Sequence, residues 1–373
     1  MTQNGLKANI GVVGLGRMGQ RHALNILHQV PRARLFAVCS PAPHEIEWAK
    51  KDLEPEGVQV FDTFEAMICT PGLGAVVIAS PSELHFSQTL AAMELGIHVL
   101  CEKPVTRDLS QVRQKISCMI IQSLSTSLQL RDLMRKAELY PQAKVMVGFV
   151  RRFDENYQDA LRKINEGAIG EPIIVRSHGA EKLDKTGYFI GYARESGGIF
   201  LDTVIHDIDL TLSFLGDEIK PKALWATGII AHHHEMKEFK DVDNAVAVVE
   251  FWGGKIAQYY HSRTTSNGYD NSTDIVGMTG KISINSVPHR NKVQVSNAAG
   301  IIQDITPSWI DRYREAFVTE LTRFTDAMLD KTELPMTLSA AHTGLKIAIS
   351  LQKSLETGRK IEFDEHGEEL LPN

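Results

Sequence analysis

The sequence predicts an α/β protein: an N-terminal doubly wound parallel sheet, followed by an α+β domain with a large, mostly antiparallel open sheet. Three observations lead to this fold class. Residues 1–150 alternate short apolar runs with helical patterns, which is typical of a parallel sheet covered by helices. From residue 173 onward, apolar runs follow one another with turn signals between them. The length of 373 residues suits two domains, which we expect at 1–150 and 151–373.

In the first domain, the apolar runs are expected to be strands. Helices cover both faces of a parallel sheet, so its strands are buried on both sides and are apolar almost throughout. The expected strands cover residues 8–13, 34–39, 58–61, 75–79, 97–101 and 144–149. The expected helices include residues 20–30, 44–53 and 85–95, and an amphipathic helix over 151–166 follows.

The segment between Asp108 and Lys144 is longer than one helix and a short turn require. It contains an apolar, serine-rich run at residues 116–127 that has no acidic residue. This run either lengthens the helix or forms a loop, and one hypothesis is that it is not native coding sequence.

In the second domain, seven runs are expected to be strands of the open sheet, and two helices follow them. The expected strands cover residues 173–180, 221–231, 245–251, 255–263, 273–277, 281–287 and 292–295. The helices cover 313–329 and 339–357, and the second stops at Gly358, a usual position for a helix-ending glycine. A strand-like segment at 360–363 ends the fold, and its return to the first domain is one possibility.

Composition and charge exclude several functional classes. The net charge of −6 offers no basic field to nucleic acid or to an anionic membrane, and no run of about 18 apolar residues exists. Residues 1–9 are polar and lack the apolar core of a signal peptide. The four cysteines lack metal-ligand spacing, which favours reduced thiols. We therefore expect a cytoplasmic protein without a nucleic-acid or membrane partner and without a metal.

A glycine fingerprint follows the first expected strand and opens the next helix, which is the context that dinucleotide binding requires. Gly14 permits the tight turn, Gly16 lets the backbone approach a pyrophosphate, and Gly19 lets the helix pack on the strand. The helix N-terminus then offers free N–H groups to the phosphates. The sequence predicts a dinucleotide site here, with Arg17 and Met18 in the same loop.

The end of the second strand bears on the choice between NAD and NADP. An acidic residue normally stands there and binds the ribose 2′-hydroxyl, but this chain has Ser40. This position therefore has no carboxylate that would repel a 2′-phosphate. His44, Lys50 or Lys51 could attract such a phosphate. The cofactor is therefore expected to be NAD or NADP, with a slight preference for NADP.

Three ionisable residues have the chemistry to oxidise an alcohol. A base must take the hydroxyl proton while hydride leaves for the nicotinamide, and histidine suits this task near neutral pH. Asp202 and His206 are four residues apart and share one face if their segment is helical. Lys103, beside Pro104 at a strand end, could polarise the substrate oxygen. Taken alone, the Asp202–His206 spacing favours a helix-side ion pair over a catalytic pair, and Lys103 could be a surface lysine.

The order and spacing of five segments resemble the Gfo/Idh/MocA oxidoreductase family, and its inositol dehydrogenase branch most closely. These segments are residues 11–19, 77–85, 102–105, 147–154 and 197–209, so the resemblance covers nearly the whole chain. It implies a Rossmann domain followed by an open antiparallel α/β domain. It also implies a homodimer or homotetramer that assembles through the open sheet face.

The resemblance also implies roles for individual residues. Lys103, Asp202 and His206 resemble the catalytic triad, in which His206 would accept the proton. The positions that resemble cofactor contacts are Ser80, Pro81, His85, Glu102 and Lys103. The positions that resemble substrate contacts are Arg152, His178, Asp209 and Tyr269. Gly179 and Ala180 stand where larger polar side chains are expected, so a polyol or sugar other than inositol remains open.

The leading hypothesis is an NAD(P)-dependent oxidoreductase that transfers hydride between a nicotinamide and a CHOH group of a polyol, cyclitol or sugar. One alternative keeps the cofactor but changes the substrate to an aldose or a dihydrodiol. Another is a non-catalytic regulator that senses NAD(P), although such relatives tend to lose the lysine that Lys103 represents.

Overall fold

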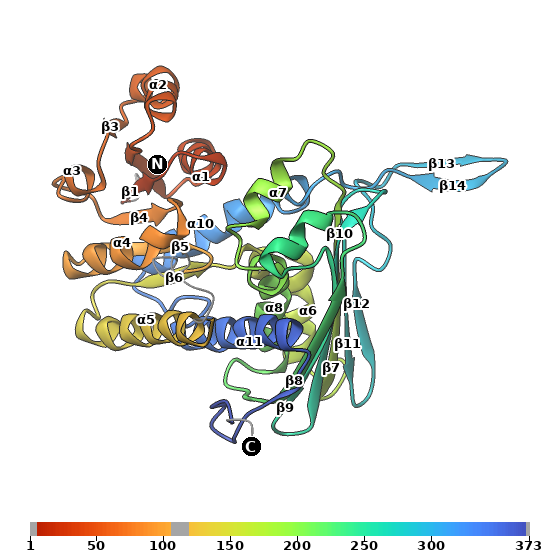
Figure 1. The fold of residues 1–373 in the computed structure, drawn as a ribbon. Coiled ribbons are helices and arrows are strands. Elements are labelled where there is room, and N and C mark those ends of the chain that lie inside the picture. Colours follow the sequence, from red (N-terminus) through yellow and green to blue (C-terminus); the bar gives the residue numbers. More distant parts are fainter. Residues whose placement is uncertain (1–5, 106–118, 371–373) are drawn as a thin grey trace. The chain divides into compact units, whose positions relative to one another are not determined.

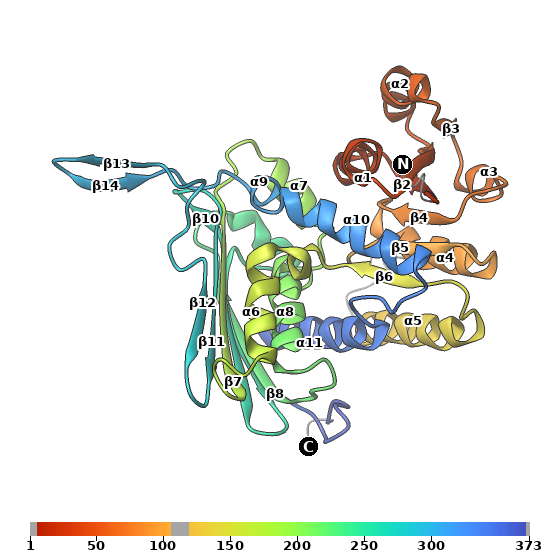
Figure 2. The same ribbon diagram turned by 180° about the vertical axis from the view of Figure 1, so that it is seen from behind.

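The computed structural model describes residues 6–105 and 119–370, and the chain forms two compact units (Figures 1 and 2). The first unit is Met1–Phe153 together with Glu315–His342, and the second is Asp154–Arg314 together with Thr343–Asn373. Helix α10 (Arg314–Leu329) thus belongs almost wholly to the first unit, although it lies far along the chain. The sequence pattern gives no sign that the chain returns to the first unit here.

The first unit contains a six-stranded sheet in the order β3-β2-β1-β4-β5-β6, and every neighbouring pair is parallel. This order confirms the predicted doubly wound sheet. The strands are β1 (Ala8–Val13), β2 (Ala33–Cys39), β3 (Gln59–Phe61), β4 (Ala75–Ile78), β5 (His98–Glu102) and β6 (Val145–Gly148). The strand order reverses between β1 and β4, and ligands of such sheets bind beside the carboxyl ends of the strands at that point.

Helices α1 (Arg17–Gln29), α2 (Pro43–Asp52), α3 (Phe64–Ile68), α4 (Ser82–Glu94) and α5 (Met119–Leu139) complete the unit with α10, and a 3₁₀ turn, η1 (Glu54–Glu56), follows α2. The serine-rich run at 116–127 lies partly outside the described residues. From Met119 onward it is helical, so the extra residues lengthen α5.

The second unit contains a seven-stranded sheet in the order β12-β11-β7-β10-β9-β8-β15. The strands are β7 (Pro172–Lys182), β8 (Pro221–Ile229), β9 (Asn244–Phe251), β10 (Lys255–Thr265), β11 (Asp270–Gly277), β12 (Lys281–Ile284) and β15 (Ile361–Glu362). All neighbours are antiparallel except β7 and β10, so the predicted mostly antiparallel sheet is confirmed. The last strand, β15, pairs with β8 in this sheet rather than returning to the first one.

Helices lie along one face of this sheet. Both α6 (Glu155–Asn165) and α8 (Ile205–Leu215) lie on the same side in the two views, and within the described part of the unit no helix covers the other face (Figures 1 and 2). The remaining helical segments are α7 (Tyr188–Ala193), α9 (Trp309–Arg312), α11 (Leu338–Thr357), and the short turns η2 (Val150–Phe153), η3 (Phe200–Val204) and η4 (His234–Phe239). The predicted helix at 151–166 is split into η2 and α6 because Asp154 caps the N-terminus of α6.

Strands β13 (Gln294–Asn297) and β14 (Gly300–Gln303) form a separate two-stranded hairpin that projects from the second unit (Figures 1 and 2). The sequence predicted a strand at 292–295 but assigned it to the large sheet, and this assignment is wrong. Alternating residues identify a strand, but they do not identify its partner.

Candidate cofactor site and active site

The glycine loop between β1 and α1 has the shape that the fingerprint predicts. Gly14 has a positive φ of 81°, and a β-carbon on it would lie 2.7 Å from the Cα atom of Ser80. A β-carbon on Gly19 would lie 1.7 Å from the carbonyl oxygen of Gly14, so this helix position must be glycine. No side chain caps the start of α1 at Gly16. The N-terminus of α1 therefore suits a pyrophosphate.

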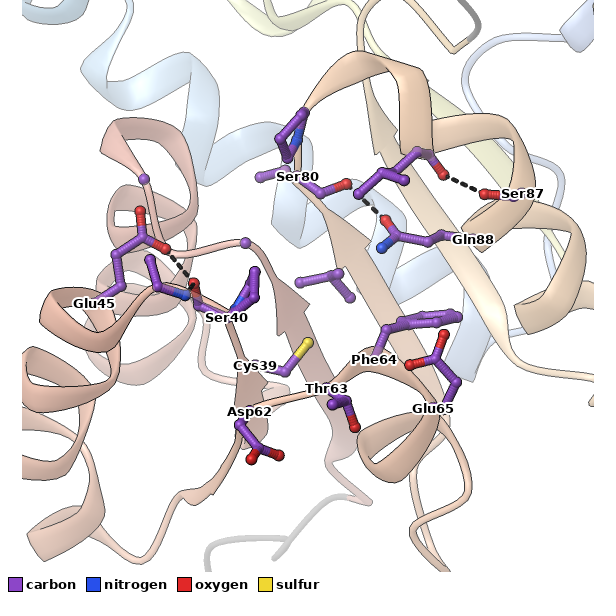
Figure 3. A pocket seen from close by; sticks show the side chains of 18 of the residues that line it. Cys39, Ser40, Glu45, Asp62, Thr63, Phe64, Glu65, Ser80, Ser87 and Gln88 are labelled. Atoms are coloured by element: carbon purple, nitrogen blue, oxygen red, sulfur yellow. Dashed lines mark hydrogen bonds between the residues drawn. The ribbon is translucent and has the colours of Figure 1, made fainter. Parts of the chain in front are cut away.

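A cavity of about 780 Å³ lies beside this loop and brings together several predicted cofactor residues (Figure 3). Gly14 and Gly16 line it from the glycine loop, Ser40 from the end of β2, and Ser80 and Pro81 from the loop after β4. The Oγ atom of Ser80 donates a hydrogen bond to Gln88 Oε1 at 2.6 Å. The cavity thus opens where the strand order reverses, and its lining fits a dinucleotide.

A carboxylate does stand at the end of β2, but helix α2 supplies it. Ser40 Oγ donates a hydrogen bond to Glu45 Oε2 at 2.5 Å (Figure 3). The backbone N–H of Leu15 donates to the same oxygen at 3.0 Å. The sequence interpretation considered only the strand end and missed Glu45. Its signal was an acidic residue in the first turn of the helix that follows Ser40.

His85, on α4, joins the loop after β4 to the turn after β5. Its side chain is 2% exposed, its Nδ1 atom lies 2.8 Å from the carbonyl oxygen of Pro104, and its Nε2 atom lies 2.8 Å from that of Ser80. Burial alone would lower the pKa of His85. The Cys101 side chain and these two carbonyl groups outweigh burial and raise the pKa to about 9.

Glu102 lies at the end of β5 beside Lys103 and accepts a hydrogen bond from His22 Nε2 at 2.8 Å. Although burial would raise the pKa of Glu102, His22, Lys103 and His85 together lower it below its usual range. The His22 ring meets Phe317 of α10 edge-on, with centroids 5.8 Å apart. On the same helix, Glu320 is fully buried, and burial together with the nearby Glu102 carboxylate raises its pKa far above the usual value. His22 and Glu320 were not identified from the sequence.

In the second unit, the predicted Asp202 and His206 lie on consecutive turns. Asp202 is in the π-helical turn η3, and His206 is in the first turn of α8, with Asp209 three residues later on the same face. Such π-helical turns are frequent at functional sites. The Asp202 carboxylate accepts hydrogen bonds from the Tyr192 hydroxyl at 2.7 Å and from Arg263 Nη2 at 3.0 Å.

Arg263 is a buried cation of this unit, with 3% of its surface exposed. Its guanidinium lies 4.8 Å from the ring centroid of Phe189, and the Asp202 and Asp241 carboxylates raise its pKa against the effect of burial. Burial raises the pKa of Asp241, whose Oδ1 atom accepts a hydrogen bond from the backbone of Ile199. Sequence reasoning missed Arg263 because its partner Asp202 is 61 positions away.

The glycine at position 179 has a structural explanation. His261, on β10, pairs in register with Gly179 on β7, and its Nε2 atom lies 2.7 Å from the buried Asp207 Oδ2 atom. A β-carbon at Gly179 would lie 2.6 Å from His261 Cε1. The imidazole therefore fills the space that a larger residue at position 179 would take.

Three further residues were predicted to contact the substrate, and each has its own surroundings. Tyr269 is buried with its ring edge-on to Tyr313, and Arg152 lies in η2 of the first unit. His178 is on β7 and alternates with residues that face the helices, so it lies on the opposite face of the sheet from α8. There it contacts Ser272 Oγ at 3.0 Å and the ring of Tyr260. The structure therefore does not bring His178 to the face that carries His206 and Asp209.

In the parts of the chain that the structure describes, no helix is both long and apolar enough to span a membrane. The same residues contain no cluster of three or more histidine, cysteine or acidic side chains suited to a metal ion.

Comparisons with known proteins agree with these features. The sequence model of an oxidoreductase family with an NAD-binding Rossmann fold, Gfo/Idh/MocA, matches residues 8–123, and that of the Gfo/Idh/MocA C-terminal domain matches residues 157–283. The chain is 31% identical to scyllo-inositol 2-dehydrogenase (NAD(+)) of Bacillus subtilis, over 95% of both proteins. It is 28% identical to myo-inositol 2-dehydrogenase of Thermotoga maritima, over 95% of this chain and 98% of that protein.

Among solved structures, scyllo-inositol dehydrogenase of Lactobacillus casei with bound NAD(H) and scyllo-inositol is similar, with a TM-score of 0.86 and 30% identity. The similarity covers 95% of this chain and 99% of that one. The fold, the glycine loop and these matches along the chain lead to one conclusion: the protein belongs to the Gfo/Idh/MocA oxidoreductase family.

Proposed function

We propose that this protein is a dehydrogenase that uses NAD to oxidise a CHOH group of a cyclitol of the inositol class. The observation that carries the proposal is the cavity beside the glycine loop, whose lining fits a dinucleotide and includes the Glu45 carboxylate. The substrate class follows from the relatives, two of which are inositol 2-dehydrogenases matched over almost the whole chain.

The proposed mechanism divides proton transfer and substrate orientation among a few residues. The nicotinamide, when bound, accepts the hydride. His206 takes the hydroxyl proton, and Lys103 stabilises the oxygen from which that proton leaves. Asp202 orients the reacting groups, and Tyr192 and Arg263 in turn hold the Asp202 carboxylate in place. These roles for Lys103, Asp202 and His206 rest on the family resemblance.

The carboxylate of Glu45 favours NAD, and this replaces the slight preference for NADP that Ser40 suggested. The Glu45 Oε2 atom already accepts two hydrogen bonds, whereas no described residue donates to Oε1, which is therefore available to a ribose hydroxyl. A 2′-phosphate would bring negative charge against this carboxylate. Asp62 and Glu65 line the same cavity and add to the repulsion.

Steady-state kinetics with both cofactors test this preference. The Glu45→Gln variant should lower the ratio of kcat/KM for NAD to that for NADP by about tenfold or more, because it removes the charge and replaces one of the two acceptor oxygens by an NH2 donor. Glu65→Gln, which removes the same charge elsewhere in the cavity, is the matched control and should change the ratio less. An unchanged ratio in Glu45→Gln would show that Glu45 does not select the cofactor.

The substrate class is tested by following the absorbance of the reduced nicotinamide with a panel of myo-inositol, scyllo-inositol, glucose and xylose. We expect turnover with an inositol and NAD, and a much lower kcat in His206→Ala with cofactor binding largely retained. Turnover of glucose or xylose alone would favour the aldose alternative. Binding of NAD without turnover of any of these substrates would favour a regulator.

We also propose that two copies associate through the open face of the second sheet, as the family resemblance implies. That face exposes a row of large apolar side chains whose exposed fractions are about 40%: Trp225, Val246, Val248, Ile256 and Tyr260. Contiguous apolar surface of this kind usually marks an interface. Light scattering during gel filtration would reveal a dimer or tetramer, and a monomer at micromolar concentration would contradict the proposal.

The cysteines support a reducing compartment such as the cytoplasm. Cys39, Cys69 and Cys101 are free, and burial raises the pKa of Cys39 to about 12, so that it stays an unreactive thiol.

A further inference from the structure

We propose that His85 is a permanent imidazolium at neutral pH and that its two N–H groups clamp the Ser80 loop to the turn of Lys103 and Pro104. Its role as a positioning residue for the cofactor loop rests on the proposed function, whereas its charge state does not.

The positions of the two ring nitrogens of His85 require the charge. Both ring nitrogens of His85 lie 2.8 Å from backbone carbonyl oxygens, one of Pro104 and one of Ser80. A carbonyl oxygen can only accept a hydrogen bond, and a neutral imidazole has one N–H donor and one acceptor nitrogen. In either neutral tautomer, a nitrogen lone pair would therefore point at an oxygen lone pair at hydrogen-bond distance. Only the doubly protonated ring satisfies both contacts.

The surroundings can hold such a charge. The titratable groups that interact with His85 come from β5: the side chain of Cys101 and the carboxylate of Glu102. Glu102 also interacts with Lys103 and His22, so its carboxylate is a counter-ion shared by these groups. Strand β4, which packs against α4 as well, is wholly apolar, and α5 adds the ionisable residues Arg131, Asp132, Arg135, Lys136 and Glu138.

The consequence is a fixed link between two predicted cofactor segments. One N–H group binds the carbonyl oxygen of Ser80, which precedes Pro81, and the other binds the carbonyl oxygen of Pro104, which follows Lys103. The loop after β4 therefore cannot shift without breaking a charge-assisted hydrogen bond in a buried site. Loss of the proton would release one end of this link.

Nitrogen-15 NMR of histidine side chains tests the charge directly, without any substrate. In long-range ¹⁵N–¹H spectra at about pH 8, where a free histidine is neutral, both ring nitrogens of His85 should show the protonated pattern. His98 is an internal control, because its Nδ1 atom accepts the Lys144 N–H at 3.0 Å and its pKa is lowered by burial and by Lys144. A neutral pattern for His85 under these conditions would overturn the proposal.

The His85→Gln variant assigns the signal and tests the positioning role. Glutamine keeps one donor but loses the charge, so kcat/KM with NAD should fall about tenfold, whereas His98→Gln should remain near wild type. Wild-type kcat/KM in His85→Gln would refute the positioning role. If His85→Gln does not fold, backbone-to-ring correlations in the wild-type protein assign the signal instead. Absence of turnover with every inositol would instead count against the proposed function and leave the NMR result standing.

Discussion

Each unit contains a buried charged cluster, and the cations of the two clusters differ. In the first unit, the imidazole of His85 accompanies the carboxylate of Glu102. In the second, the guanidinium of Arg263 accompanies Asp202 and Asp241. An imidazolium can lose its proton at moderately alkaline pH, whereas a guanidinium keeps its charge. The charge of His85, whose pKa is raised to about 9, should therefore be lost at alkaline pH, while that of Arg263 should persist.

The largest effect is expected from removing the guanidinium of Arg263. In Arg263→Met, Asp202 loses a hydrogen bond, and both it and the buried Asp241 lose their nearby positive charge. Removing one partner from a buried ion pair typically costs about 3–5 kcal/mol of unfolding free energy. Urea unfolding measures this loss, with Arg263→Lys as the control, which keeps the charge without the planar fork and should lose less. Equal stability of Arg263→Met and wild type would show that this cluster does not depend on its cation.

The next effect is the pH dependence of stability that the charge of His85 produces. The folded pKa of His85 is about 9 against an ordinary value of 6.5, so its stabilising contribution is complete below pH 6.5 and is lost as the pH rises through about 9. At 1.36 kcal/mol for each pKa unit, the loss is at most about 3 kcal/mol. Urea midpoints measured at several pH values should decline across this range in the wild type. The decline should be shallower in His85→Gln, and a slope equal to that of the wild type would contradict the assignment.

The smallest effect concerns Glu320. Because its pKa is raised, the folded protein keeps a proton that the unfolded chain releases above the usual value of 4.5, so stability decreases as the pH rises through that value. Glutamine mimics the protonated side chain and can ionise in neither state. Glu320→Gln should therefore be as stable as wild type or more stable by about 1 kcal/mol at neutral pH. Glu315→Gln, on the exposed face of the same helix, should change the urea midpoint little. Marked destabilisation by Glu320→Gln alone would mean that the carboxylate is ionised and needed.

The parts of the fold that could be predicted from the sequence are those that depend on local patterns. Alternating strands and helices predict the parallel sheet, and the glycines at 14, 16 and 19 predict the phosphate loop, because their spacing between a strand and a helix is itself a local pattern. The partner strand of β13 could not be predicted, because the alternation that identifies a strand contains no information about its neighbour.

The site was less predictable where it depends on contacts between distant segments. Glu45 replaces the missing carboxylate from the next helix, and Arg263 reaches Asp202 from a strand 61 positions later. The charge of His85 depends on two carbonyl groups, of which that of Pro104 belongs to another loop. Only Glu45 had a signal in the sequence, its place in the first turn of the helix after Ser40, whereas the contacts of Arg263 and of Pro104 are seen only in the packed structure.

The contact between Gly179 and His261 has a consequence for how this protein can change. With 2.6 Å between a β-carbon at position 179 and the ring, neither residue can be varied alone: alanine at 179 requires a smaller residue at 261, and replacing His261 removes a hydrogen bond to the buried Asp207 carboxylate. The three positions are therefore epistatic. A mutational library that randomises residue 179 to alter substrate choice will yield mostly inactive clones unless residues 207 and 261 are randomised with it.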